Sequence, residues 1–189
     1  MCMEAEMFTN PNLCEKKFQL KVSAAALAAA LEKLNRVAPD KDARTILNCV
    51  CMEIDETGKC TLVASDGIRA AKAEFAGTII TPTAGPITIL IPKQQVGQLT
   101  STIGRSNNGQ VVVLVDEARV AVIDPANGWR LQFAMLDGRY PDWRRVIPVV
   151  TERWSSLEVE REQLISSLER AKILSDSRLN AVSDRKSVV

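Results

Sequence analysis

The sequence predicts an α+β fold in which one block, a strand followed by a helix and a three-stranded antiparallel meander, is used twice. Three observations predict it. Helical patterns follow short alternating strands, Asp-Gly or Asn-Gly pairs separate the later apolar runs, and the blocks start at equal spacing. The starts lie near residues 18, 87 and 156, about 69 residues apart, which indicates an internal repeat.

The first repeat opens with an alternating strand at residues 18–22. Ser23 is a good N-cap for an alanine-rich helix over residues 24–37, and Pro39 ends that helix. An Asp-Gly pair between apolar runs is a strong hairpin signal and separates the last two strands of the repeat. We expect these meander strands at about residues 46–54, 60–65 and 68–76.

The second repeat keeps the order, with a strand at residues 86–91 and a helix over 93–103. A third copy opens with a strand at 157–159 and an amphipathic helix over 161–173. We expect the two complete helices on one face of antiparallel sheets, which leaves the other face to polar alternate positions. The second meander is predicted at about residues 110–116, 119–124 and 129–136.

Composition excludes several classes of protein. The chain has 189 residues, 46% of them hydrophobic, a net charge of +1 and no histidine, so imidazole-based triads and histidine zinc sites are excluded. Its five cysteines are odd in number and lack a C-x-x-C spacing, which favours a reducing cytoplasm over a disulfide framework. No apolar run is long enough to span a bilayer. We predict no catalytic residue, no metal and no cofactor.

Two motifs are more specific. The runs Ser65-Asp-Gly-Ile-Arg-Ala70 and Leu136-Asp-Gly-Arg-Tyr-Pro-Asp-Trp-Arg-Arg-Val-Ile-Pro148 resemble the bacterial DNA polymerase III β subunit, the replicative sliding clamp. Arg44-Thr-Ile-Leu-Asn48, Ile91-Pro-Lys93 and Ala171-Lys-Ile-Leu-Ser175 support the match. The resemblance covers about residues 17–180 and implies the DNA clamp (processivity) fold. Its counterpart is the middle domain of the three-domain clamp and the opening of the last domain.

The resemblance also predicts a domain organisation. We expect a disordered leader at residues 1–16 and a clamp domain of two repeats at 17–148. The truncated start of a following clamp domain is expected at 149–183, and a non-native tail at 184–189. A compact phage-type clamp whose first domain carries these motifs is an alternative.

As a function, the resemblance implies a non-enzymatic processivity factor that encircles double-stranded DNA without reading its sequence. The implied partners are the DNA polymerase III α subunit, the clamp loader and other proteins with a clamp-binding motif. Two full-length subunits would form the ring. Partner peptides would insert apolar side chains into a pocket whose matching positions are Leu47, Ser65, Gly67, Ile68, Arg69, Ala70, Pro141, Arg145 and Val146.

Holding a duplex without reading it requires cations directed at phosphates from helices that line the ring. The candidates are Lys33 and Arg36 on the first helix, and Lys93 and Arg105 around the second. These residues could equally be solvated charges on helix faces.

Other interpretations stay open. A stand-alone peptide-binding module without a DNA role is the main rival. A carboxylate-dependent enzyme is a weaker one, resting on Asp66 and Asp137 in Asp-Gly turns that look equivalent in the two repeats. The Trp143 stretch could be an interdomain linker packing on its own core. The remaining expectations concern packing: buried thiols on one strand face for Cys49 and Cys51, and packing roles for Trp129 and Trp154.

Overall fold

The computed structural model describes residues 18–81, 85–106, 109–147, 151 and 155–173. The chain divides into two compact parts, Met1–Pro148 and Val149–Val189, and each is described by itself. The predicted leader, the predicted tail and Trp154 lie outside the described residues.

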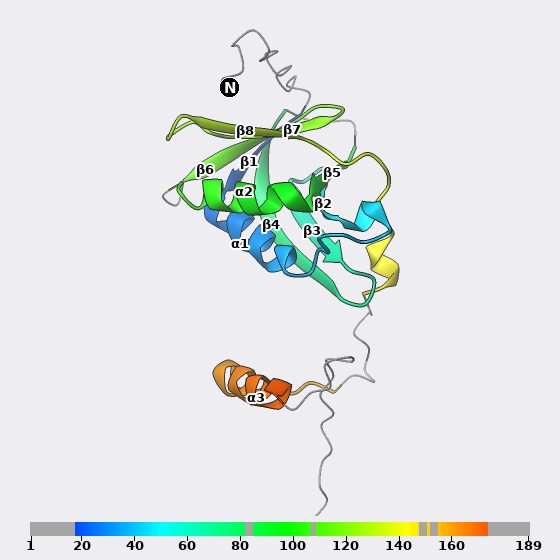
Figure 1. The fold of residues 1–189 in the computed structure, drawn as a ribbon. Helices are drawn as coiled ribbons and strands as arrows, with labels where there is room; N and C mark the ends of the chain where they lie inside the picture. The colour runs from blue at the N-terminus through cyan, green and yellow to red at the C-terminus, as the bar shows by residue number, and fades with distance from the viewer. Residues whose placement is uncertain (1–17, 82–84, 107–108, 148–150, 152–154, 174–189) are drawn as a thin grey trace, which may run out of the picture. The chain divides into compact units, whose positions relative to one another are not determined.

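Both complete repeats form as predicted (Figure 1). The first contains β1 (Phe18–Ser23), α1 (Ala24–Asn35), the 3-10 turn η2 (Thr45–Leu47), β2 (Cys49–Ile54), β3 (Lys59–Ser65) and β4 (Ala70–Thr81). The second contains β5 (Ile87–Pro92), α2 (Lys93–Ile103), β6 (Gln110–Val115), β7 (Arg119–Asp124) and β8 (Trp129–Ala134), and a 3-10 turn, η3 (Trp143–Arg145), follows it. The largest deviation is β4, which runs well past the predicted end at residue 76.

The eight strands form one antiparallel sheet in the order β5-β2-β3-β4-β1-β6-β7-β8. Each repeat places its first strand against the meander of the other, because β1 pairs with β6 and β5 pairs with β2. Neither exchange was predicted, since alternation shows which face a residue takes but not which strand lies beside it. We call β5, β2, β3 and residues 70–76 of β4 the first half-sheet, and β1, β6, β7 and β8 the second.

The two helices lie side by side on one face of the sheet, as predicted (Figure 1). Ser23 caps α1, its Oγ accepting a hydrogen bond from the Ala26 amide at 3.4 Å. The spacing of Leu27, Leu31 and Leu34 turns all three toward the sheet, and none is more than 1% exposed. The main core therefore lies between this layer and the inner sheet face, with buried residues that include Leu20, Met52, Leu62, Ile89, Val96, Leu99, Ile103, Val113 and Val122.

Gly77 marks the point where β4 leaves β3 and joins β1. Residues through Ala76 pair with β3, and Gly77 pairs with Val22 of β1. A Cβ at Gly77 would lie 2.9 Å from Val22 Cγ1 and 3.0 Å from Leu20, which are both core side chains. The absence of a side chain thus lets one strand belong to both half-sheets.

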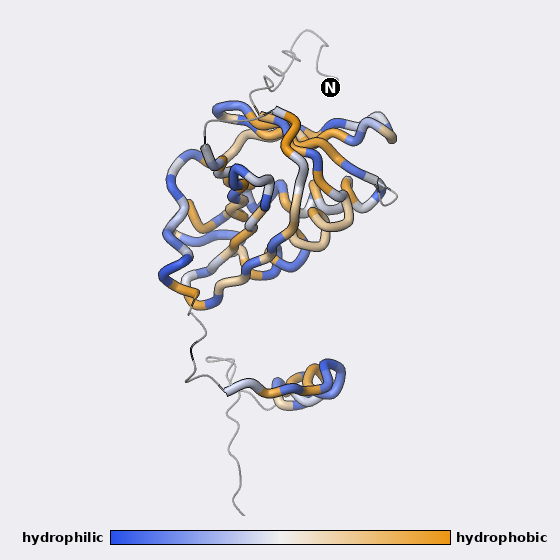
Figure 2. The backbone as a smooth tube through the Cα atoms, turned by 180° about the vertical axis from the view of Figure 1, so that it is seen from behind, coloured by the Kyte–Doolittle hydropathy of each residue, from blue (hydrophilic) through white to orange (hydrophobic). Residues whose placement is uncertain are grey.

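In the second part of the chain the predicted helix is confirmed as α3 (Arg161–Ile173), but the predicted strand at residues 157–159 is wrong. A strand needs a neighbour to pair its backbone groups, and the described residues of this part contain no other strand. Short stretches of hydrophobic residues are interspersed with hydrophilic ones along α3 (Figure 2), and Leu164 is 45% exposed. Among the described residues, none of the helices combines the length and the apolar character that a membrane span requires.

Candidate functional site

Residues 136–147, which we call the return segment, leave β8 and cross the outer face of the first half-sheet (yellow in Figure 1). The Leu136 amide donates to the Leu90 carbonyl of β5 at 3.1 Å. Tyr140 is only 8% exposed. It belongs to a second core, on the sheet face opposite the helices, whose buried members are Leu47, Cys49, Cys51, Val63, Leu90 and Tyr140.

The two alternating cysteines lie in this second core, and the prediction that both are buried is confirmed, each being 0% exposed. Burial raises the pKa of the Cys49 thiol to about 12. Burial, followed by the nearby Glu53 carboxylate, also raises the pKa of Cys51. Both groups therefore stay protonated thiols at neutral pH and are poor nucleophiles. Trp129 likewise packs against the main core, as predicted.

A cavity of about 300 Å³, which we call the apolar hollow, opens beside the second core. Three segments that are distant in sequence form it: the η2 region, the turn between β3 and β4, and the return segment. Its volume is at the low end for pockets that hold small ligands or side chains. The lining residues are Arg44, Ile46, Leu47, Ser65, Gly67, Ala70, Tyr140, Pro141, Trp143 and Val146.

The turn between β3 and β4 is fixed by its own polar groups. Asp66 Oδ1 accepts hydrogen bonds from the backbone amides of Arg69 at 2.7 Å and Ile68 at 2.9 Å. These two bonds hold the pKa of the Asp66 carboxyl at about 2, below its usual range. Ser65 Oγ accepts from the Gly67 amide at 3.1 Å and donates to the Arg69 carbonyl at 2.8 Å. The rim of the hollow is therefore well ordered at this side.

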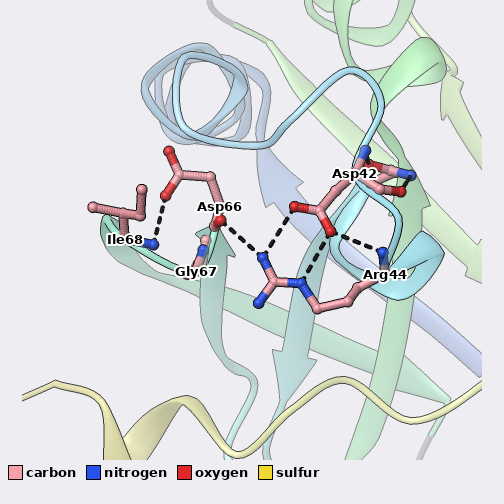
Figure 3. Close-up of polar contacts among 7 residues, drawn as sticks. Asp42, Arg44, Asp66, Gly67 and Ile68 are labelled. Carbon is pink, nitrogen blue, oxygen red and sulfur yellow. Dashed lines mark hydrogen bonds and ion pairs between the residues drawn. The ribbon is translucent and has the colours of Figure 1, made fainter. Parts of the chain in front are cut away.

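Arg44 ties this turn to the loop that precedes β2 (Figure 3). Its Nε and Nη2 each lie 3.0 Å from an oxygen of the Asp42 carboxylate, and Nη2 also donates to the Asp66 carbonyl at 3.1 Å. Gly67 has φ +88°, and a Cβ there would lie 2.5 Å from Arg44 Nη2. Glycine at this position thus serves both the turn and the close approach of the guanidinium.

Of the nine predicted pocket positions, the structure brings six together around the apolar hollow: Leu47, Ser65, Gly67, Ala70, Pro141 and Val146. Ile68, Arg69 and Arg145 do not line it. The Ile68 side chain points away from Arg44 and is 95% exposed (Figure 3).

The two arginines point elsewhere because each pairs with an aspartate three residues before it. Arg69 Nε lies 2.9 Å from Asp66, and Arg145 Nε lies 3.2 Å from Asp142. The D-x-x-R spacing of both pairs is visible in the sequence and could have indicated these contacts.

Sequence reasoning missed four lining residues, Arg44, Ile46, Tyr140 and Trp143. All four lie inside runs that carried the family resemblance. The signal was therefore present, but only the folded return segment shows which members of those runs face the hollow.

The four predicted phosphate contacts lie on the helix layer and its ends. Lys33 and Arg105 are exposed, and Arg36 is exposed but pairs with Glu32 at 3.1 Å. The Lys93 ammonium donates to the Asn35 carbonyl at the end of α1, so it ties the two helices together. A role in DNA binding remains a prediction for all four.

The equivalence of Asp66 and Asp137 is wrong. Asp137 follows β8, whereas the turn between β7 and β8, which corresponds to the turn at Asp66, begins at Asp124. Asp124 Oδ1 accepts from the amides of Ala126 and Asn127, in the manner of Asp66. Paired turns, rather than paired catalytic carboxylates, explain the repetition. In the described ranges no three His, Cys, Asp or Glu side chains gather to form a metal site.

Comparison with known proteins gives a consistent result. Residues 21–142 match the family model for the central domain of the DNA polymerase III beta subunit. The beta sliding clamp of Vibrio cholerae is 27% identical over 180 residues, which are 95% of this chain and 47% of that protein. The chain spans about half the length of the curated relatives it matches.

Solved structures show the same fold. The crystal structure of the DNA polymerase III subunit beta from Pseudomonas aeruginosa superposes with a TM-score of 0.81 at 19% identity, covering 93% of this chain and 46% of that one. The Helicobacter pylori beta clamp bound to a DNA ligase peptide superposes with a TM-score of 0.79 at 19% identity, covering 92% and 46%.

Proposed function

Because the chain belongs to the family of the DNA polymerase III beta subunit, whose central domain its residues 21–142 match, we propose that it serves in DNA replication as part of a sliding clamp. It would act as a processivity factor that keeps a DNA polymerase on its template, and it would have no catalytic activity of its own. The cytoplasm, where a bacterial chromosome is copied, is the proposed location.

The proposed activity of the described domain is the capture of short peptides from partner proteins. The observation that carries this proposal is the apolar hollow, enclosed by the 65–70 turn and the return segment on the sheet face opposite the helices. Apolar walls with Arg44 and Ser65 at the edge suit a short linear peptide that inserts apolar side chains. A relative of the same fold has been crystallised with a DNA ligase peptide.

The proposed partners are the DNA polymerase III α subunit, the clamp loader and other proteins with a clamp-binding motif. Micromolar capture of a peptide corresponds to roughly −8 kcal/mol, which permits both recruitment and exchange of partners.

The proposed DNA role belongs to the full-length protein, as a ring of two subunits around the duplex. Lys33 belongs to α1, Arg36 and Arg105 follow the ends of α1 and α2, and none of the three lines the hollow. Contacts from such residues to phosphate would hold any sequence equally and would weaken as salt rises. A stand-alone peptide-binding module that lacks this DNA role is the second candidate, and the apolar hollow supports it equally.

Fluorescence anisotropy with a fluorescein-labelled DNA ligase peptide tests peptide capture. We expect saturable binding in the micromolar range, and its absence up to about 1 mM, an affinity near −4 kcal/mol, would contradict the proposal. Retention of the full-length gene product on circular but not on linearised plasmid tests the DNA role. Equal loss from both plasmids would favour the stand-alone module.

A further inference from the structure

We propose that Glu53, which does not line the apolar hollow, positions the wall of that hollow and thereby sets its affinity for peptides. It is a positioning residue rather than a contact residue. The part of this inference that concerns affinity rests on the proposed peptide capture, whereas the part that concerns the return segment does not.

Glu53 contacts two consecutive residues of the return segment, about 90 positions later in the chain. Its Oε1 accepts a hydrogen bond from the Trp143 indole Nε1 at 3.1 Å. Its Oε2 lies 2.6 Å from Arg144 Nη2, and Arg144 Nη1 lies 3.4 Å from Oε1. One carboxylate therefore holds both a ring N–H and a guanidinium, and charge-assisted bonds of this kind are the stronger ones in proteins.

The place of Glu53 on β2 explains why these bonds matter. Side chains alternate along β2, so Cys49, Cys51 and Glu53 all point to the outer face. The two cysteines are fully buried beneath the return segment, whereas Glu53 lies opposite Thr61 and Thr88 of the neighbouring strands. Its side chain is 25% exposed. Glu53 is thus the polar residue at which the covered, apolar part of this face ends.

Trp143 separates two cavities at this boundary. It lines the apolar hollow, and it also lines a second cavity of about 500 Å³ that is rich in charged side chains, Glu53 and Arg144 among them. The Arg144 guanidinium lies 4.3 Å from the centre of the indole ring, and the Lys72 ammonium lies 5.6 Å from it. The hydrogen bond from Nε1 and these two cations fix the orientation of the ring. A fixed ring gives the hollow a preformed wall.

The middle of the return segment is held by Tyr140, which is buried in the second core, but the residues after Tyr140 are mostly exposed. Pro141, Arg145 and Val146 are exposed, and η3 is a single turn capped by Asp142, whose Oδ1 accepts from the Arg144 amide at 3.3 Å. Leu136 is bonded to β5 at the start of the segment, so Glu53 is the tether near its other end. Release of this tether would leave a mobile wall, and ordering it again would weaken peptide binding.

The test compares Glu53→Ala and Glu53→Gln with Glu56→Ala and Glu56→Gln. Glu56 is exposed in the turn between β2 and β3 and lines neither cavity, so its variants make the same chemical changes without touching the Glu53 contacts. Affinity is measured with the labelled DNA ligase peptide, and amide hydrogen exchange is followed over residues 136–147.

We expect Glu53→Ala to weaken binding about tenfold, as loss of a charged hydrogen-bonding group typically does, and to speed exchange in the return segment. Glu53→Gln keeps an acceptor for the indole N–H, so its affinity for the peptide should fall only about threefold. Both Glu56 variants should match the wild type.

Three results would overturn the inference. The first is a Glu53→Ala variant with wild-type affinity and wild-type exchange. The second is faster exchange throughout the sheet together with a lower urea midpoint, because Glu53 would then only support the fold. The third concerns Trp143→Phe, which removes the indole N–H and keeps an aromatic ring. If the double variant lost as much binding free energy as Glu53→Ala and Trp143→Phe lose together, the two residues would act independently. If the wild type binds no peptide, the proposed function fails, and faster local exchange in Glu53→Ala would still establish the tether.

Discussion

The outer faces of the two half-sheets are built from equivalent strands but are covered differently. On the first, Cys49, Cys51 and Val63 are buried beneath the return segment. On the second, Leu114 and Ala121 form a separate small cluster with the flanking Val112 and Ile123. Repetition therefore explains the fold, whereas the candidate site depends on a segment that is used once. The hollow exists only where the chain, after finishing the second repeat, folds back onto the first.

The largest expected effect comes from removing the side chain that covers the first half-sheet. Tyr140→Ala should lower the free energy of unfolding by about 3 kcal/mol or more, because a buried aromatic side chain is lost from a packed cluster. Arg130→Ala, at an exposed position of β8 in the second half-sheet, should change it by less than about 0.5 kcal/mol. Urea denaturation measures both. Equal costs for the two variants would mean that the faces are not covered differently.

A second prediction compares the turns that join the last two strands of each repeat. Gly67 and Gly128 both have positive φ, +88° and +67°, but an added Cβ meets Arg44 only at Gly67, and at Gly128 nothing lies within 4 Å. Gly128→Ala should cost about 1 kcal/mol from backbone strain alone. Gly67→Ala should cost about 1 kcal/mol more, because the Arg44 guanidinium must move as well.

Urea denaturation measures the free energy of unfolding of both glycine variants, each alone and each combined with Arg44→Ala. Removal of Arg44 should reduce the cost of Gly67→Ala and leave that of Gly128→Ala unchanged. Equal costs in the Arg44→Ala background and in the wild type would show that Arg44 does not fix the first turn.

A third prediction separates residues that line the hollow from a neighbour that does not. Val146 is 65% exposed and lines it, and Ile68 is 95% exposed and lies outside it. Val146→Asp should weaken peptide binding about tenfold or more, because an inserted apolar side chain would meet a charge. Ile68→Asp should change binding by less than about threefold, since no wall of the hollow is altered. Anisotropy titrations measure the affinity of both variants. A greater loss of affinity for Ile68→Asp would favour the binding residues predicted from sequence over those that line the hollow.

The smallest effect is that of pH. The chain has no histidine, so stability should vary little between about pH 5 and pH 8. The pKa of Asp66 is lowered to about 2, so its contribution is present above the unfolded-state value near 4 and is lost as pH falls toward 2. The pKa of Cys49 is raised to about 12. The contribution of its buried neutral thiol to the free energy of unfolding is therefore fully present below pH 9 and is lost as pH rises from there toward 12.

Urea midpoints of the wild type and of Asp66→Asn across this range test the acid limb. Asp66→Asn should make this limb shallower, while Asp124, whose pKa is also lowered to about 2, keeps its own contribution. An identical acid limb in the Asp66→Asn variant would mean that the turn hydrogen bonds contribute nothing to stability.

Much of the fold could be predicted from local patterns. The Ser23 cap, the leucine spacing of α1 and the Asp-Gly turn each determine local structure within a few residues. The exchange of β1 and β5 between the repeats could not, because side-chain alternation carries no information about neighbours. The strand expected at residues 157–159 failed for a related reason, since a strand pattern without a partner leaves its backbone groups unpaired.

Part of the candidate site was equally predictable. The family resemblance identified both segments that meet at the hollow, but it could not show which side chains face inward. Arg69 and Arg145 turn to their own aspartates, and Tyr140 and Trp143 take the inner positions. The contacts of Glu53 could not be predicted from the sequence, because its partners lie about 90 residues away and only the fold brings them together.

Amide chemical-shift perturbation during a titration with the labelled DNA ligase peptide tests the central claim most directly. We predict shifts confined to residues 44–47, 65–70 and 140–146, the three segments that surround the apolar hollow. Shifts concentrated on β6 and β7 of the second half-sheet, or on the exposed face of α1 and α2, would contradict the claim that the return segment creates the binding site.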